Sequence, residues 1–339
     1  FSATVDSMLL PLLHSIYLIA GAGLLYVGGA RLVDGAGGLA LAFEVSPLVV
    51  GLTVVAFGTS APELFVSLLA ALRGQPGISL GNVLGSNVIN LALVLGLSVL
   101  IRPVATGATI ARVDLPVMLL SYVLVVGAAI TPTVSVGWWL QGNIGPVEGA
   151  IMLGVLAVYL RALYRRPGAA RSELLDHETD PDTARARPVW KDLVLVLVGI
   201  IALALGAEGL VRGASWLAVE LFGASERFVG IAIVALGTSL PELVTTIVSL
   251  VRGETDISVG NLVGSNIFNG LMVAGTTSLV RPLEIGLTDY RLDVGVMIAV
   301  SLLVTGAALL HGRLSRLLGA TLLTAYLGYL IYLGQTMTA

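Results

Sequence analysis

Two short motifs each occur twice in this sequence, and a single spacing relates both pairs. Residues 56–64, AFGTSAPEL, recur as ALGTSLPEL at 235–243, and residues 81–90, GNVLGSNVIN, recur as GNLVGSNIFN at 260–269. In both pairs the second copy lies 179 residues after the first. Two matches at one offset indicate an internal duplication, so the two halves of the chain are expected to share one fold.

The sequence around these motifs is too apolar for a soluble protein. Hydrophobic residues make up 56% of the chain, charged residues 12%, and the mean hydropathy is +0.97. A soluble domain carries about 25% charged residues, and a helix needs about 20 mostly apolar residues to cross a bilayer. The pattern predicts an all-α polytopic membrane protein in a lipid bilayer. Its ten transmembrane helices are predicted at 9–32, 46–73, 79–101, 114–131, 145–164, 190–212, 226–252, 257–280, 292–310 and 315–335.

One long hydrophilic stretch, residues 165–189, divides these spans into two sets of five. Because five is an odd number, the second set enters the membrane from the opposite side, which predicts two inverted-topology five-helix repeats. Most of the 18 Lys and Arg residues fall on the side of this linker, and basic loops remain cytoplasmic. We therefore expect a multi-pass protein of the cell membrane with a cytoplasmic linker and both termini outside. The predicted units are 1–164 with its motif region at 51–103, the linker, and 190–339 with its motif region at 230–282.

Each repeat has one acidic residue in the middle of a predicted span, Glu63 in the first and Glu242 in the second. An ionisable residue inside a membrane costs about 2.5–3.5 kcal/mol on insertion scales and is functional by default. No Lys or Arg lies close in sequence to either carboxylate. The missing counter-charge predicts a bound cation or a proton. The structural alternative is a protonated pair that hydrogen-bonds between the repeats.

A glycine and a proline precede each of these carboxylates. Pro62 and Pro241 have no N–H, so the carbonyls of Gly58 and Gly237 lose their helical partners. We expect both helices to break at this turn and to present backbone oxygens to a polar cavity, where such breaks are tolerated.

The other polar residues of the motifs follow the spacing of one helix face. The predicted site residues are Ala56, Thr59, Ser60 and Glu63, then Ala235, Thr238, Ser239 and Glu242, and the i, i+4 pairs Ser86 with Asn90 and Ser265 with Asn269. Nearly all of them offer hard oxygen donors, which suit Ca²⁺ better than softer metals. Helix packing is the alternative for each hydroxyl. Packing or helix-end hydrogen bonding is also what we expect of the duplicated asparagines Asn82, Asn87, Asn261 and Asn266.

The paired GTSxPE and GNxxGSNxxN motifs resemble the α-repeats of the cation/Ca²⁺ exchanger superfamily, specifically its prokaryotic Na⁺/Ca²⁺ exchanger branch. The resemblance covers both repeats and implies an ion pocket near the midplane. It implies acidic metal ligands at Glu63 and Glu242. It implies hydroxyl ligands at Thr59, Ser60, Ser86, Thr238, Ser239 and Ser265, carbonyl ligands at Ala56 and Ala235, and side-chain ligands at Asn90 and Asn269.

The same resemblance makes the first and sixth spans a long pair that slides to gate access. Small residues suited to sliding are Gly29, Ala30, Gly35, Ala36, Gly206, Ala207, Gly213 and Ala214. One position departs from several members of the superfamily, because Asn269 stands where they have Asp. The pocket therefore carries two formal charges rather than three, which disfavours K⁺ cotransport.

These features predict a secondary-active antiporter that exchanges Ca²⁺ for Na⁺. The alternatives are an H⁺/Ca²⁺ antiporter on the same scaffold and, ranked lower, a passive cation channel. The proton-coupled branch usually has an acid soon after Gly-Asn, where this chain has apolar residues, so Na⁺ coupling is favoured. No enzyme activity, cofactor or protein partner is predicted, and the net charge of −3 does not suit nucleic-acid binding.

Overall fold

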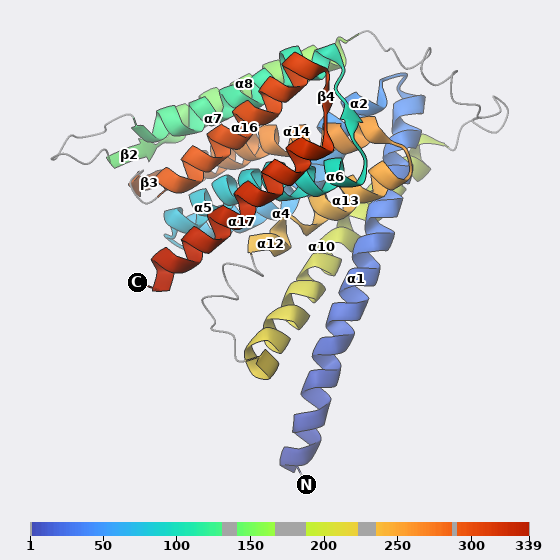
Figure 1. The fold of residues 1–339 in the computed structure, drawn as a ribbon, viewed down its shortest axis with the longest axis vertical. Coiled ribbons are helices and arrows are strands. Elements are labelled where there is room, and N and C mark those ends of the chain that lie inside the picture. The colour runs from blue at the N-terminus through green and yellow to red at the C-terminus, as the bar shows by residue number, and fades with distance from the viewer. Residues whose placement is uncertain (1, 131–140, 167–187, 223–234, 287–289, 339) are drawn as a thin grey trace.

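The computed structural model describes residues 2–130, 141–166, 188–222, 235–286 and 290–338 (Figure 1). Within these ranges the chain is almost entirely helical, with short strands between some of the helices. The elements of the first half are α1 (Ser2–Ala42), α2 (Pro47–Val50), η1 (Gly51–Val55), α3 (Ala56–Thr59), α4 (Ala61–Leu72), α5 (Pro76–Val88), η2 (Ile89–Val94), α6 (Leu95–Ile101), β1 (Val104–Ala105), η3 (Ile110–Asp114), α7 (Leu115–Ile130), β2 (Gln141–Ile144) and α8 (Pro146–Tyr164). Those of the second half are α10 (Val189–Phe222), α12 (Ala235–Thr238), α13 (Leu240–Val251), α14 (Thr255–Phe268), η5 (Asn269–Val273), α15 (Ala274–Val280), β3 (Leu283–Gly286), α16 (Arg291–His311), β4 (Arg313–Leu314) and α17 (Arg316–Thr338).

Nine of the ten predicted spans coincide with described helices. Among the described residues, eight helices are long and apolar enough to cross a membrane, and the bent pair Pro47–Thr59 and Ala61–Leu72 makes a ninth if it is one span. The tenth prediction, 226–252, lies partly outside the described residues, and its described part contains α12 and α13. The inverted relation of the two halves stays a prediction.

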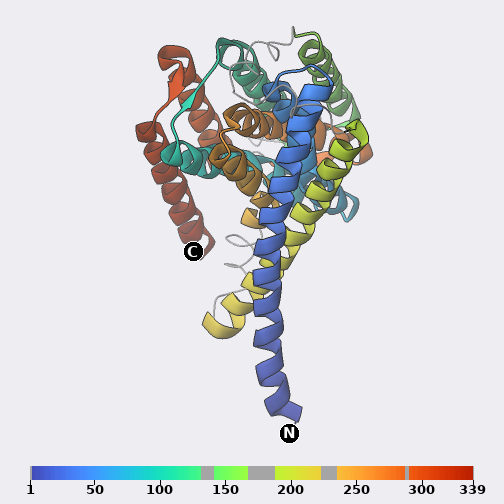
Figure 2. The ribbon, with the colours of Figure 1, turned by 90° about the vertical axis from the view of Figure 1, so that its right-hand side faces the viewer.

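The two longest helices, α1 and α10, lie side by side and antiparallel (Figures 1 and 2). α1 was predicted at 9–32 but runs from Ser2 to Ala42. Its glycines allow the α10 backbone to come close: a Cβ on Gly28 would lie 2.8 Å from the nitrogen of Leu203. The contact glycines are Gly21, Gly28 and Gly35 on α1 and Gly199, Gly206 and Gly213 on α10. Gly29, predicted for this contact, lies against Val244 of α13 instead.

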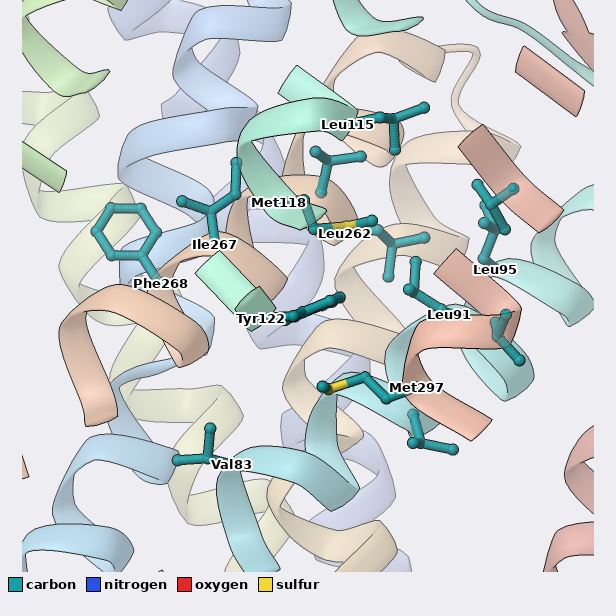
Figure 3. Close-up of a cluster of buried hydrophobic side chains, with 14 of the residues drawn as sticks. Val83, Leu91, Leu95, Leu115, Met118, Tyr122, Leu262, Ile267, Phe268 and Met297 are labelled. Carbon is teal, nitrogen blue, oxygen red and sulfur yellow. The ribbon is translucent and has the colours of Figure 1, made fainter. Parts of the chain in front are cut away.

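The spans that carry the second motif form the centre of the molecule. Helix α5 continues through η2 into α6, and α14 continues through η5 into α15. The most apolar window of the Thr255–Val280 span is completely buried. Figure 3 shows the apolar core around it, in which Leu262 and Phe268 of α14 lie among side chains of α5, α7 and α16.

Two short antiparallel strand pairs connect the ends of the outer spans. β1 pairs with β4, and β2 pairs with β3. Each pair joins one strand from the first half of the chain to one from the second half, so the halves are linked outside the helix core as well as within it.

The start of the hydrophilic linker is tied to the helix core by a buried ion pair. Arg166 donates two hydrogen bonds, of 2.7 and 3.0 Å, to the carboxylate of Asp114, which also accepts a 2.8 Å bond from the hydroxyl of Tyr159. Asp114 is fully buried. Its charge is compensated because Arg166 and Tyr159 together satisfy both carboxylate oxygens.

Candidate ion-binding site

Glu63 and Glu242 each lie in the first turn of a helix, where the chain resumes after a break. The break falls at Ser60, between α3 and α4, and at Ser239, between α12 and α13. The two segments of the span that carries Glu63, Pro47–Thr59 and Ala61–Leu72, meet at an angle of 42°. Unpaired N–H groups at a helix N-terminus favour a negative charge, so each break creates a setting suited to a carboxylate.

Both carboxylates are fully buried, and that of Glu242 contacts the opposite repeat. The hydroxyl of Ser60 donates a 3.4 Å hydrogen bond to Oε1 of Glu242. Because Ser60 lies three residues before Glu63, this bond brings Glu242 next to the turn that carries Glu63. The contacts therefore join residues that are 182 positions apart in the sequence into a single polar site.

Several polar atoms of this site have no hydrogen-bond partner among the residues that the structure describes. They are Oε1 and Oε2 of Glu63, Oε2 of Glu242, Oγ of Ser239, and both amide atoms of Asn90 and of Asn269. Leaving one buried polar atom unpaired costs about 1–3 kcal/mol, and more when the group is charged. A bound cation with oxygen ligands would satisfy these carboxylate, hydroxyl and amide oxygens together, and it would supply the missing positive charge.

The hydroxyl of Thr59 lies at the meeting point of the two repeats. Its Oγ1 lies 3.1 Å from Oγ of Ser265 and donates to Oδ1 of Asn261 over 3.0 Å. Thr59 is fully buried, as are Ser60 and Ser265. The structure thus brings predicted hydroxyls of both repeats together with Glu242.

The remaining predicted residues differ in their accessibility. Ser86 and Ser239 are buried, and Thr238 is half-buried. The carbonyl of Ala56, predicted as a ligand, accepts from the amide of Ser60 over 3.0 Å and lies 3.3 Å from Oγ1 of Thr59. The second repeat differs at this turn, because the amide of Ser239 bonds to the carbonyl of Leu236.

Two polar residues of the site region were not singled out from the sequence. Ser67 and Thr246 each accept a hydrogen bond from a duplicated asparagine, Asn82 and Asn261 respectively. They are related by the same offset of 179 residues as the motifs, so the repeat contained the signal. Asn82 and Asn261 were expected to serve packing or helix-end hydrogen bonding, and in the structure each donates to the helix that precedes it.

Comparison with known proteins now places the chain. The family model described as "Sodium/calcium exchanger protein" matches residues 13–165 and 191–335. The chain belongs to the sodium/calcium exchanger family. Among its relatives are the putative antiporter CaxA of Alkalimonas amylolytica, 33% identical over 94% of this chain and 98% of that protein, and the sodium/calcium exchanger MaX1 of Methanosarcina acetivorans, 29% identical over 94% and 97%.

A solved structure supports the same assignment. The sodium-calcium exchanger NCX_Mj, soaked with Na⁺ and Sr²⁺, matches with a TM-score of 0.78 and 30% sequence identity, over 95% of this chain and 99% of that one. The resemblance to the cation/Ca²⁺ exchanger superfamily is therefore confirmed, and this member of the exchanger family is a transmembrane ion transporter.

Proposed function

We propose that this exchanger moves Ca²⁺ in exchange for Na⁺ by alternating access at the site that contains Glu63 and Glu242. The observation that carries the proposal is the pair of buried carboxylates, one from each repeat, with unpaired oxygens and no Lys, Arg or His bonded to them in the described part of the chain. Two negative charges neutralise one Ca²⁺, so the same oxygens can hold Ca²⁺ or Na⁺ ions in turn. Relatives that are named sodium/calcium exchangers support Na⁺ as the counter-ion.

We propose that oxygens from both repeats bind the ion directly. The carboxylates would compensate the charge, and neutral oxygens would complete the six to eight ligands that Ca²⁺ prefers. The proposed neutral ligands are Ala56, Thr59, Ser60, Ser86, Asn90, Ala235, Thr238, Ser239, Ser265 and Asn269. The helix breaks at Gly58 and Pro62, and at Gly237 and Pro241, would keep the carboxylate turns next to the backbone oxygens.

Access would alternate through movement of α1 and α10 relative to the other helices, with the termini outside and the linker in the cytoplasm. Two observations support this movement. One is the set of glycine contacts between α1 and α10, and the other is the weak ion pair that connects α1 to α13. Asp34 of α1 forms a 2.6 Å ion pair with Arg252 at the end of α13, and both side chains are about one-third exposed. An exposed ion pair contributes about 0–1 kcal/mol, which is small enough to be broken and remade in a transport cycle.

Uptake of ⁴⁵Ca²⁺ into proteoliposomes tests the counter-ion. Vesicles loaded with Na⁺ are expected to accumulate Ca²⁺, whereas vesicles loaded with K⁺ at the same ionic strength are not. If a pH gradient alone drives uptake, the counter-ion is H⁺. If Ca²⁺ enters without any counter-ion gradient and carries current, the protein is a channel. Three Na⁺ per Ca²⁺ would move net charge, so a membrane potential is also expected to change the rate.

A third carboxylate in the site is expected to change its ion preference. Asn269 is fully buried with both amide atoms unpaired, so Asn269→Asp places a new negative charge beside the two present. A divalent ion gains about twice as much Coulomb energy from this charge as a monovalent ion. We expect Ca²⁺ to bind about tenfold more tightly relative to Na⁺, which corresponds to about 1.4 kcal/mol.

Competition of Na⁺ against ⁴⁵Ca²⁺ binding measures this change. The matched control is Asn266→Asp, which adds the same charge to the same helix. The side chain of Asn266 accepts a 2.8 Å bond from Tyr122 of α7, so its charge would lie away from the site. Equal ion preference in wild type and Asn269→Asp would remove Asn269 from the proposed ligand set.

A further inference from the structure

In each repeat, one asparagine links the carboxylate-bearing turn to the next helix. In the first repeat, Nδ2 of Asn82 on α5 donates to the carbonyl of Glu63 over 3.1 Å and to Oγ of Ser67 over 2.9 Å. In the second, Nδ2 of Asn261 on α14 donates to the carbonyl of Glu242 over 3.5 Å and to Oγ1 of Thr246 over 3.0 Å. The same amide geometry at both repeats sets the height and rotation of each carboxylate turn relative to the helix beside it.

Asn261 makes one more contact, and this contact crosses between the repeats. Its Oδ1 accepts the hydroxyl proton of Thr59 over 3.0 Å. A hydroxyl has one proton and two lone pairs. A hydroxyl that ligates a cation must direct a lone pair toward the ion and its proton elsewhere. The buried amide oxygen of Asn261 is a nearer acceptor for this proton, at 3.0 Å, than the carbonyl of Ala56 at 3.3 Å, so it orients the Thr59 oxygen for coordination.

We propose that Asn82 and Asn261 are positioning residues of the ion site, and that Asn261 in addition orients the hydroxyl of Thr59 in the opposite repeat. The proposal rests on the proposed function, because it assumes that Glu63, Glu242 and Thr59 hold the ion. Outer-shell groups that orient ligands typically change metal affinity by about 10- to 100-fold when they are removed. Through the contact of Thr59 with Asn261, the Ca²⁺ affinity of a ligand in the first repeat depends on a side chain of the second.

A double-mutant cycle on purified protein tests the proposal, with the Ca²⁺ dissociation constant measured by equilibrium binding of ⁴⁵Ca²⁺. Asn261→Leu keeps the approximate shape but removes the donor and the acceptor, and it is expected to raise the dissociation constant by about 10- to 100-fold. Thr59→Val is expected to cost less affinity in the Asn261→Leu background than in wild type, because the hydroxyl is no longer oriented. In the structure Thr59 and Asn82 form no hydrogen bond with each other. The losses of affinity in the control pair, Thr59→Val with Asn82→Leu, are therefore expected to add.

The outcomes separate positioning from a general structural role. A positioning role raises the dissociation constant and the KM for Ca²⁺ while uptake at saturating Ca²⁺ is largely retained. A merely structural role lowers the yield and the melting temperature with an unchanged dissociation constant, and this result would overturn the proposal. Additivity in the Thr59 and Asn261 cycle would also overturn the role assigned to the Thr59 contact.

A second variant covers the case in which Asn261→Leu does not fold. Thr246→Val removes the hydroxyl that anchors the Asn261 amide and preserves its shape. Loss of this hydrogen bond is expected to raise the dissociation constant about fivefold, and an unchanged value would overturn the proposal. Wild-type protein that binds no Ca²⁺ would reject the proposed function itself, whereas wild-type binding with unaltered variants would reject only the positioning role.

Discussion

Replacing either buried carboxylate with its neutral isostere is expected to abolish Ca²⁺ exchange without unfolding the protein. Glu63→Gln and Glu242→Gln each remove one of the two negative charges that would balance the ion. Because loss of an outer-shell group alone costs about 10- to 100-fold in metal affinity, loss of a charged ligand is expected to cost more than about 100-fold. The measurement is Na⁺-dependent ⁴⁵Ca²⁺ uptake, normalised to the amount of reconstituted protein.

Stability measurements show whether the lost uptake reflects the site. Since both carboxylates are fully buried with unpaired oxygens, and burying an uncompensated charge is costly, both variants are expected to be at least as stable as wild type in ion-free buffer. Ca²⁺ at 100 times its dissociation constant stabilises the wild type by about 2.7 kcal/mol, and it is expected to leave the variants unchanged. The control is Glu208→Gln on α10, whose exposed side chain pairs with Arg212. Full exchange activity in both Glu63→Gln and Glu242→Gln would refute the assignment of the site.

A single methyl group at the contact between α1 and α10 is expected to have a large effect on stability. A Cβ on Gly21 would lie 2.5 Å from the backbone nitrogen of Leu210, so Gly21→Ala forces the two helices apart. Overpacking of this kind costs about 1–3 kcal/mol. We expect a lower melting temperature and a slower exchange, because the same interface supports the proposed movement.

The matched control lies two residues away on the same helix. A Cβ on Gly23 would meet no atom within 4 Å, so Gly23→Ala brings only the gain in helix propensity, about 1 kcal/mol, that both substitutions share. The difference between the two melting temperatures therefore isolates the steric effect. Equal stabilities for Gly21→Ala and Gly23→Ala would mean that the helices do not approach as closely as the structure indicates.

Much of the architecture follows from the sequence because its causes are local. A run of about 20 apolar residues needs a bilayer, and a proline inside a helical run removes a helical hydrogen bond. The spans and the broken helix before Glu63 could therefore be predicted. The lack of a nearby Lys or Arg is visible in the sequence itself. The 179-residue offset also related Glu63 to Glu242 before any contact was known.

The tertiary structure decided which partner each of these groups meets. Periodicity identifies the face of a helix, but the neighbour of that face depends on how distant helices pack. The contacts of Ser60 with Glu242 and of Thr59 with Asn261 join the two halves of the chain, and no local rule predicts them. Glycine composition likewise could not distinguish Gly21, where an added Cβ would clash with α10, from Gly23, where it would meet no atom within 4 Å. The sequence by itself determined the types of group in the site, and the packing of the helices determined which of them act together, because close contact depends on distances that the order of residues does not specify.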